Sequence, residues 1–250
     1  MQSKLSTILL ILLLLVTNCK QRHKTGSSDI LSSEATGECF PGSPPAAEKC
    51  GVWFPYDYNA PQEMYDLFKA QQWNEIYVEP RLIDAGMALG LTREEILSIS
   101  AYTQVEFTAM NAELRTKNIS DKYQPLIYLS GSGLRKLPKF VGTVFRGTNL
   151  RPEILEKYQT AFKNKTPLQE LGFMSTTSSE EVLSQGFGAK NGRFIVESSH
   201  GAAVDMLSTF PEEKEVLFPP GTWFQIVDIK QEQLTEGTRI TIKMKELSIQ

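Results

Sequence analysis

Two hydrophobic patterns divide the chain near Pro138. From about residue 60 to 137, apolar residues recur at the spacing of helices, and after Pro138 they gather in short runs. The segment LTREEILSISAYTQVEFTAMNAELR begins with Thr92 and Glu95 at the spacing of a capping box, which predicts the start of a helix. The next segment, DKYQPLIYLSGSGLRKLP, predicts another helix that ends before Pro138.

The runs after Pro138 are rich in β-branched and aromatic residues, which predicts strands. One short helical stretch, SSEEVLSQGF, interrupts them. The predicted strands are VGTVFR, FMSTT, RFIVESS, EVLF, WFQIVDI and RITIKMK. Helices first and strands second favour the α+β fold class over alternating α/β.

The first nineteen residues, MQSKLSTILLILLLLVTNC, have the pattern of an export signal. Lys4 precedes an apolar stretch from Ile8 to Val16, which is shorter than the roughly 20 apolar residues of a membrane span. We therefore expect residues 1–18 to be a signal peptide and exclude them from the fold.

Cys19 ends this stretch and resembles the lipidated cysteine of bacterial lipoproteins, although Val16 and Asn18 depart from the usual lipobox. The alternative is a plain cleaved signal with an incidental cysteine. Residues 20–50 are rich in Ser, Gly, Pro and charged residues, which predicts a flexible tether over residues 19–55. Within this tether, Cys39 and Cys50 form a disulfide or remain free thiols, and we expect the pair.

Composition excludes several functions. The chain has 250 residues and a net charge of −3, which gives no sign of nucleic-acid binding or of a polybasic membrane surface. The two histidines, His23 and His200, lie apart, and no His/Cys cluster has metal-ligand spacing. No glycine-rich fingerprint follows a predicted strand, so neither a Rossmann nor a P-loop site is expected.

The segment FPEEKEVLFPPGTWFQI places Glu213 and Glu215 next to an apolar run. On one continuous strand, residues at i and i+2 point to the same face, about 6.6 Å apart. The two carboxylates then serve one ligand together. The alternative is a solvated strand edge whose charges prevent aggregation.

Two further signals lie on predicted strands. Arg146 in GTVFRGTN can hold a phosphate in bidentate fashion. The hydroxyls of Ser175, Thr176 and Thr177 in GFMSTTSS can bond sugar hydroxyls or the neighbouring backbone. Each signal is weak when it stands alone.

The order of these three signals along the chain is much more specific than any one of them. FRG, then GFMSTT, then EKEVLFPPGTWF resembles the Arg–Ser–Glu class of mono-ADP-ribosyltransferases, the arginine-specific branch. The helical half is similar to the helical lobe of that family, and the resemblance covers roughly residues 60–245. One departure is Thr177, where the family's triplet usually ends in Ser.

The resemblance implies a catalytic domain over residues 56–250 with a helical lobe followed by two packed, roughly perpendicular β-sheets. NAD is the implied substrate, bound in the cleft between the sheets, without a metal. By resemblance, Arg146 neutralises its phosphates and Ser175 reaches the nicotinamide-side ribose. Glu215 stabilises the oxocarbenium-like transition state, and Glu213 orients and deprotonates the acceptor arginine.

Four other residues are given supporting roles. Thr176 is expected beside bound NAD, and Gly147 either lets the backbone come close to the ligand or ends the strand. Phe187 resembles the aromatic residue that covers the nicotinamide. Phe210 resembles the exposed aromatic of the turn that recognises the target. For both phenylalanines the alternative is ordinary packing.

Two other functions stay open. Water can replace the acceptor arginine, which makes the chain an NAD glycohydrolase. The chain can also be a non-catalytic, lipid-anchored binding module, although such a module has no need of the Arg146, Ser175 and paired-glutamate set. For the enzyme we expect an arginine-bearing target protein, no nucleic acid, and export to a bacterial membrane or beyond, as for a toxin.

Overall fold

The computed structural model describes residues 52–248, apart from 55–57, 77, 187–190 and 236. Several predictions lie outside the described residues. These are the signal peptide, the lipidated Cys19, the Cys39–Cys50 disulfide, nearly all of the tether, and Phe187.

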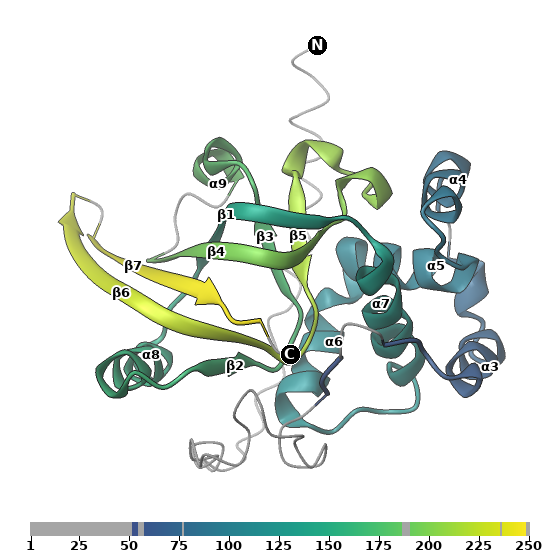
Figure 1. Cartoon of the computed structure of the whole chain (residues 1–250), viewed down its shortest axis with the longest axis horizontal. Coiled ribbons are helices and arrows are strands. Elements are labelled where there is room, and N and C mark those ends of the chain that lie inside the picture. The colour runs from purple at the N-terminus through teal and green to yellow at the C-terminus, as the bar shows by residue number, and fades with distance from the viewer. Residues whose placement is uncertain (1–51, 55–57, 77, 187–190, 236, 249–250) are drawn as a thin grey trace, which may run out of the picture. The chain divides into compact units, whose positions relative to one another are not determined.

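The first half of the described chain is a lobe of helices (Figure 1). Its α-helices are α3 Gln62–Ala70, α4 Pro80–Ala88, α5 Arg93–Ala101, α6 Phe107–Thr116 and α7 Gln124–Lys136. The predicted capping box starts α5, with Glu95 N donating to Thr92 Oγ1 and Thr92 N donating to Glu95 Oε2. A π-helical segment, Tyr102–Glu106, joins α5 directly to α6. The predicted helices of this half are confirmed.

The second half supplies the strands, and all six predicted strands are present. The strands are β1 Lys139–Thr148, β2 Leu168–Glu170, β3 Met174–Thr177, β4 Gly192–Ala203, β5 Glu215–Phe218, β6 Thr222–Leu234 and β7 Gly237–Glu246. The predicted helical stretch is α9 Glu180–Gly186. The sequence analysis missed β2 and the helix α8 Pro152–Asn164, which packs against β6.

The strand pairings explain how distant segments meet. The order is β1-β3-β5-β4-β7-β6-β2, and β1 also pairs with β4, so β1, β3, β5 and β4 close a ring of pairings. Figure 1 shows β3 and β5 crossing β1 and β4 at a steep angle. The α+β class with a helical lobe ahead of crossing groups of strands is confirmed, and hydrogen bonds link the two groups into one series.

Two apolar clusters hold the described residues together. One lies within the helical lobe and also includes Leu217 of β5 and Phe173, which immediately precedes β3. The other lies between the strands and α8, and includes Val144, Val216 and Ala161. β5 therefore contributes to both clusters, Leu217 from one face and Val216 from the other, which fixes its position between the lobe and the remaining strands.

None of the helices in the described part of the chain combines the length and apolarity that crossing a bilayer requires.

Candidate active site

Three neighbouring strands bring the predicted site residues together. On β1, Phe145 lies opposite Thr177 of β3, and Thr177 in turn lies opposite Glu215 of β5. Arg146 follows Phe145 directly, and Ser175 is diagonal to Glu215 on the same face of the β3–β5 pair. More than sixty residues of sequence separate Arg146 from Glu215, so only this pairing makes them neighbours.

Direct contacts connect the three residues. Arg146 Nη1 donates a hydrogen bond to the Ser175 carbonyl oxygen at 2.6 Å, which fixes the guanidinium beside β3. The Ser175 hydroxyl donates a hydrogen bond to the Glu215 carboxylate. The structure therefore joins the guanidinium, the hydroxyl and one acid into a single cluster.

Glu215 is almost completely buried, with 7% of the residue exposed. Burial raises the pKa of Glu215 to about 7, because desolvation disfavours the charged carboxylate. The Ser175 hydrogen bond lowers this pKa, the Glu213 charge raises it, and the Arg146 charge lowers it. The alternative of a solvated strand edge is therefore wrong for Glu215.

The prediction that Glu213 and Glu215 lie on the same face of one strand is wrong. It ends a 3₁₀ turn, Pro211–Glu213, and β5 begins only at Glu215. Lys214 between the two acids has a φ of 47°, in the left-handed region, so the acids do not share the face of one strand. Glu213 is exposed at this turn. Partial desolvation raises the pKa of Glu213, and the neighbouring Glu212 raises it further.

The other predicted residues occupy different positions. Thr176 is buried on the opposite face of β3, and its hydroxyl donates to the Val216 carbonyl oxygen at 2.6 Å. This bond gives Thr176 a role in joining β3 to β5. Gly147 lies on β1 opposite Arg193. Phe210 is half-buried before the 3₁₀ turn, where its carbonyl accepts a hydrogen bond from Glu213 N at 3.1 Å.

The family of this chain follows from its similarity to known proteins. A family model described as NAD:arginine ADP-ribosyltransferase matches residues 58–248, which include the helical lobe and every strand that the structure describes. The chain belongs to the NAD:arginine ADP-ribosyltransferase family. The resemblance seen in the sequence is confirmed.

Curated relatives of the chain carry the same family name. The chain is 31% identical over 137 residues to the putative NAD(+)–arginine ADP-ribosyltransferase Mav of Mycobacterium avium. It is 31% identical over 147 residues to the NAD(+)–protein-arginine ADP-ribosyltransferase Tre1 of Serratia proteamaculans. The alignments cover 55% and 58% of this chain but only 16% and 31% of the two relatives. The chain thus matches less than a third of the length of either relative.

Solved structures share the fold of this chain. The type III effector XopAI of Xanthomonas axonopodis pv. citri superposes with a TM-score of 0.61 at 20% identity, over 77% of this chain and 91% of that chain. The ADP-ribosyltransferase HopU1 of Pseudomonas syringae pv. Tomato superposes with a TM-score of 0.61 at 20% identity, over 76% and 99% of the two chains. At 20% identity, the similarity to these two structures shows a shared fold and nothing further.

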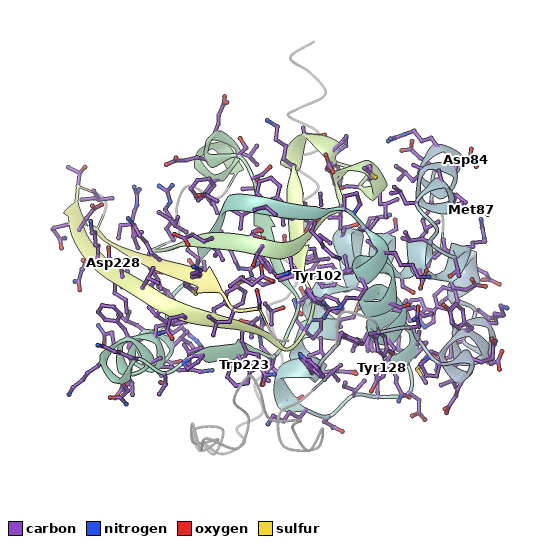
Figure 2. The ribbon with its side chains drawn as sticks, viewed as in Figure 1. Asp84, Met87, Tyr102, Tyr128, Trp223 and Asp228 are labelled. Atoms are coloured by element: carbon purple, nitrogen blue, oxygen red, sulfur yellow. The ribbon has the colours of Figure 1, made fainter. Side chains whose placement is uncertain are left out.

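The structure adds three residues of the helical lobe that the sequence analysis did not identify. Tyr102 is buried between the lobe and the strands, and both Arg146 and Glu215 influence its titration, so it lies close to the site (Figure 2). Asn111 Nδ2 donates to the Tyr102 hydroxyl at 3.1 Å. Phe107, which is 47% exposed, packs its ring edge-on against Tyr102 at 6.5 Å between ring centroids.

Helical periodicity could not have paired Tyr102 with Asn111. Residues nine apart lie on opposite sides of a regular α-helix, which turns by about 100° per residue. The π-helical segment that begins at Tyr102 has a wider turn and changes this phase. The segment contains many other polar residues, so nothing in the sequence distinguishes Tyr102 and Asn111.

Among the described residues, no group of three or more His, Cys, Asp or Glu side chains is arranged to hold a metal ion.

Proposed function

We propose that this chain is a mono-ADP-ribosyltransferase that transfers ADP-ribose from NAD to arginine side chains of target proteins and releases nicotinamide. The observation that carries the proposal is the buried Glu215, which the Ser175 hydroxyl contacts and the Arg146 charge influences. A second acid, Glu213, stands at the exposed turn just before it. Glu215 can thus contact a buried ligand, and Glu213 can contact a protein that approaches from solvent.

In the first step, the bond between nicotinamide and C1′ of the ribose breaks, and its electron pair leaves with nicotinamide. Positive charge develops on the ribose, and the ionised Glu215 stabilises it more in the transition state than in bound NAD. The Ser175 hydroxyl orients this carboxylate. Arg146, fixed by the Ser175 carbonyl, supplies positive charge for the phosphates of NAD.

In the second step, a guanidinium nitrogen of the acceptor forms a bond to C1′ and loses a proton. Arginine is protonated at neutral pH, with a pKa above about 12, so a base must accept that proton as the bond forms. Glu213 is this base, and its raised pKa makes it a stronger one. Its exposure at the turn leaves room for a protein substrate.

The proposal is tested with purified full chain, labelled NAD and agmatine as a small arginine analogue. Glu215→Gln is expected to lower nicotinamide release by about 10²–10³-fold, because an electrostatic contact to the transition state is lost. Glu213→Gln is expected to remove transfer to agmatine while NAD hydrolysis continues. Glu212→Gln, a change of the neighbouring acid on the same turn, is the matched control: it is expected to keep NAD hydrolysis and to lower transfer far less than Glu213→Gln, because it removes only one of the two causes that raise the pKa of Glu213.

The outcomes separate the candidate functions. Labelled agmatine supports the transferase, whereas free ADP-ribose without labelled acceptor would make the chain an NAD glycohydrolase. If the chain does not turn over NAD at all, the binding module is the better interpretation. Retention of agmatine transfer by Glu213→Gln would contradict the role given to Glu213.

We also propose that the enzyme is exported and anchored by a lipid on Cys19, with residues 19–55 as a tether and Cys39 paired to Cys50. The support is the sequence pattern of the first nineteen residues. The partner is an arginine-bearing protein, with Phe210 at the recognition turn and Phe187 over the nicotinamide. Metabolic labelling with palmitate, lost in Cys19→Ser, tests the anchor.

A further inference from the structure

The turn between the two glutamates carries an unusual backbone conformation. Lys214 adopts a φ of 47° and a ψ of 47°, the left-handed conformation, which is unfavourable for a residue with a side chain. Such a conformation persists when the surrounding contacts determine it. The residue before it is the proposed acceptor base, Glu213, so whatever holds this turn also sets the position of that base.

The contacts that hold the turn come from the end of β3. Thr177 Oγ1 donates to the Glu213 carbonyl oxygen at 2.7 Å, and Ser178 N donates to the Lys214 carbonyl oxygen at 3.1 Å. Ser179 N donates to the same Thr177 oxygen at 3.1 Å. A hydroxyl has a single proton, so the Thr177 proton is committed to the Glu213 carbonyl.

Glu215 is held by different contacts. The β3–β5 pairing holds its backbone, its carbonyl accepts a hydrogen bond from Val204 N at 3.0 Å, and Ser175 contacts its carboxylate. Removal of the Thr177 hydroxyl leaves every one of these contacts in place. The two acids are therefore supported separately, although only Lys214 stands between them.

We infer that Thr177 is a positioning residue for the acceptor step, because its hydroxyl holds the Glu213–Lys214 turn in the conformation that presents Glu213 to arginine. This inference rests on the proposed function. It predicts that Thr177 affects the choice between arginine and water as acceptor, whereas Ser175 and Glu215 affect cleavage of NAD itself. Thr177 is 5% exposed and acts through the backbone, without contact to the acceptor.

The test compares Thr177→Val, which replaces the hydroxyl by a methyl group of similar size, with Thr177→Ser, which keeps the hydroxyl. We expect Thr177→Val to lower kcat/KM for transfer to agmatine by about 10-fold or more, the size of one lost positioning contact. Nicotinamide release without acceptor is expected to stay within about 3-fold, as is every activity of Thr177→Ser. Thr143→Val makes the same change at an exposed position of β1 and is the matched control.

Equal loss of transfer and hydrolysis in Thr177→Val, or loss of neither, would overturn the inference. Thr177→Ala is made in parallel, and if neither variant folds the hydroxyl supports the fold and the inference is also overturned. Hydrogen exchange gives a second readout: the Glu213 and Lys214 amides, which donate to Phe210 and Pro211, should exchange faster. If the unaltered chain cleaves NAD but never modifies agmatine, the proposed function fails before this comparison is reached.

Discussion

At the scale of single residues, the burial of Glu215 decides the chemistry. A carboxylate with 7% exposure and a pKa of about 7 is half protonated near neutral pH. In the proposed mechanism only the ionised form of Glu215 stabilises positive charge on the ribose, so its burial would also limit the fraction of active enzyme. The folded protein binds this proton more tightly than the unfolded chain, whose Glu215 has the ordinary pKa of 4.5. The contribution of Glu215 to stability therefore falls as pH rises from about 4.5 to about 7.

The rate of NAD cleavage should depend on pH accordingly. We expect kcat/KM for nicotinamide release to rise about tenfold per pH unit below pH 7 and to level off above it, because this quantity reports ionisation of the free enzyme. The measurement is nicotinamide release from pH 5 to pH 9 at constant ionic strength. Circular dichroism at each pH confirms that the chain stays folded. A flat profile would show that Glu215 is already ionised at pH 5.

At the scale of elements, a buried acid ties the helices of the lobe together. Glu95 has no exposed surface, and its carboxylate joins α5 to α7 through three partners. It caps the start of α5 through Thr92 N, accepts from Ser132 on α7, and forms an ion pair with Lys136 Nζ at 2.8 Å. The capping box was visible in the sequence, but the partners on α7 were not.

Removal of one partner from this ion pair should be costly. Lys136→Met leaves the buried Glu95 charge without its cation, and we expect the free energy of unfolding to fall by about 3 kcal/mol. The control is Arg81→Met, which breaks the exposed ion pair with Glu79 and should change stability by less than about 1 kcal/mol. Urea denaturation measures both. Equal effects of the two changes would show that Glu95 does not depend on Lys136.

At the scale of the whole described domain, the helical lobe positions the active strand. Asn111 Oδ1 accepts a hydrogen bond from Phe173 N at 2.8 Å, immediately before β3, while its amide donates to Tyr102. Arg115 of the same helix forms an ion pair with Glu170, which also accepts from Gly172 N. The lobe thus holds the backbone that leads into Ser175.

Loss of the Asn111 side chain should therefore affect stability and activity together. Asn111→Ala leaves a buried N–H group of Phe173 without its acceptor, and we expect a loss of about 1–3 kcal/mol in unfolding free energy. NAD cleavage should fall as well, since β3 loses its anchor to the lobe. Thermal denaturation and nicotinamide release measure the two effects, with exposed Asn118→Ala as control. If Asn111→Ala is destabilised but keeps full activity, the contact from the lobe to β3 is not needed for NAD cleavage.

Much of this molecule could be predicted from local patterns. Apolar spacing identified the helical lobe, the Thr92–Glu95 spacing identified a helix start, and β-rich runs identified six strands. α8 was missed although Ile154, Leu155, Tyr158 and Ala161 recur at helical spacing, and these residues pack against the cluster between the strands and this helix. β2 was missed because three residues are too few for an alternating pattern.

By itself, the sequence determined the elements of the lobe, most strands and the residue types of the site, because caps, periodicity and motif order depend on neighbours along the chain. The tertiary structure alone decided how those residues act. Pairing of β1, β3 and β5 joins Arg146, Ser175 and Glu215 across long separations, and burial then sets the pKa of Glu215. Contacts from Thr177 and Ser178 place Glu213 on a left-handed turn and not on a strand, and no local pattern records a contact made between segments so far apart.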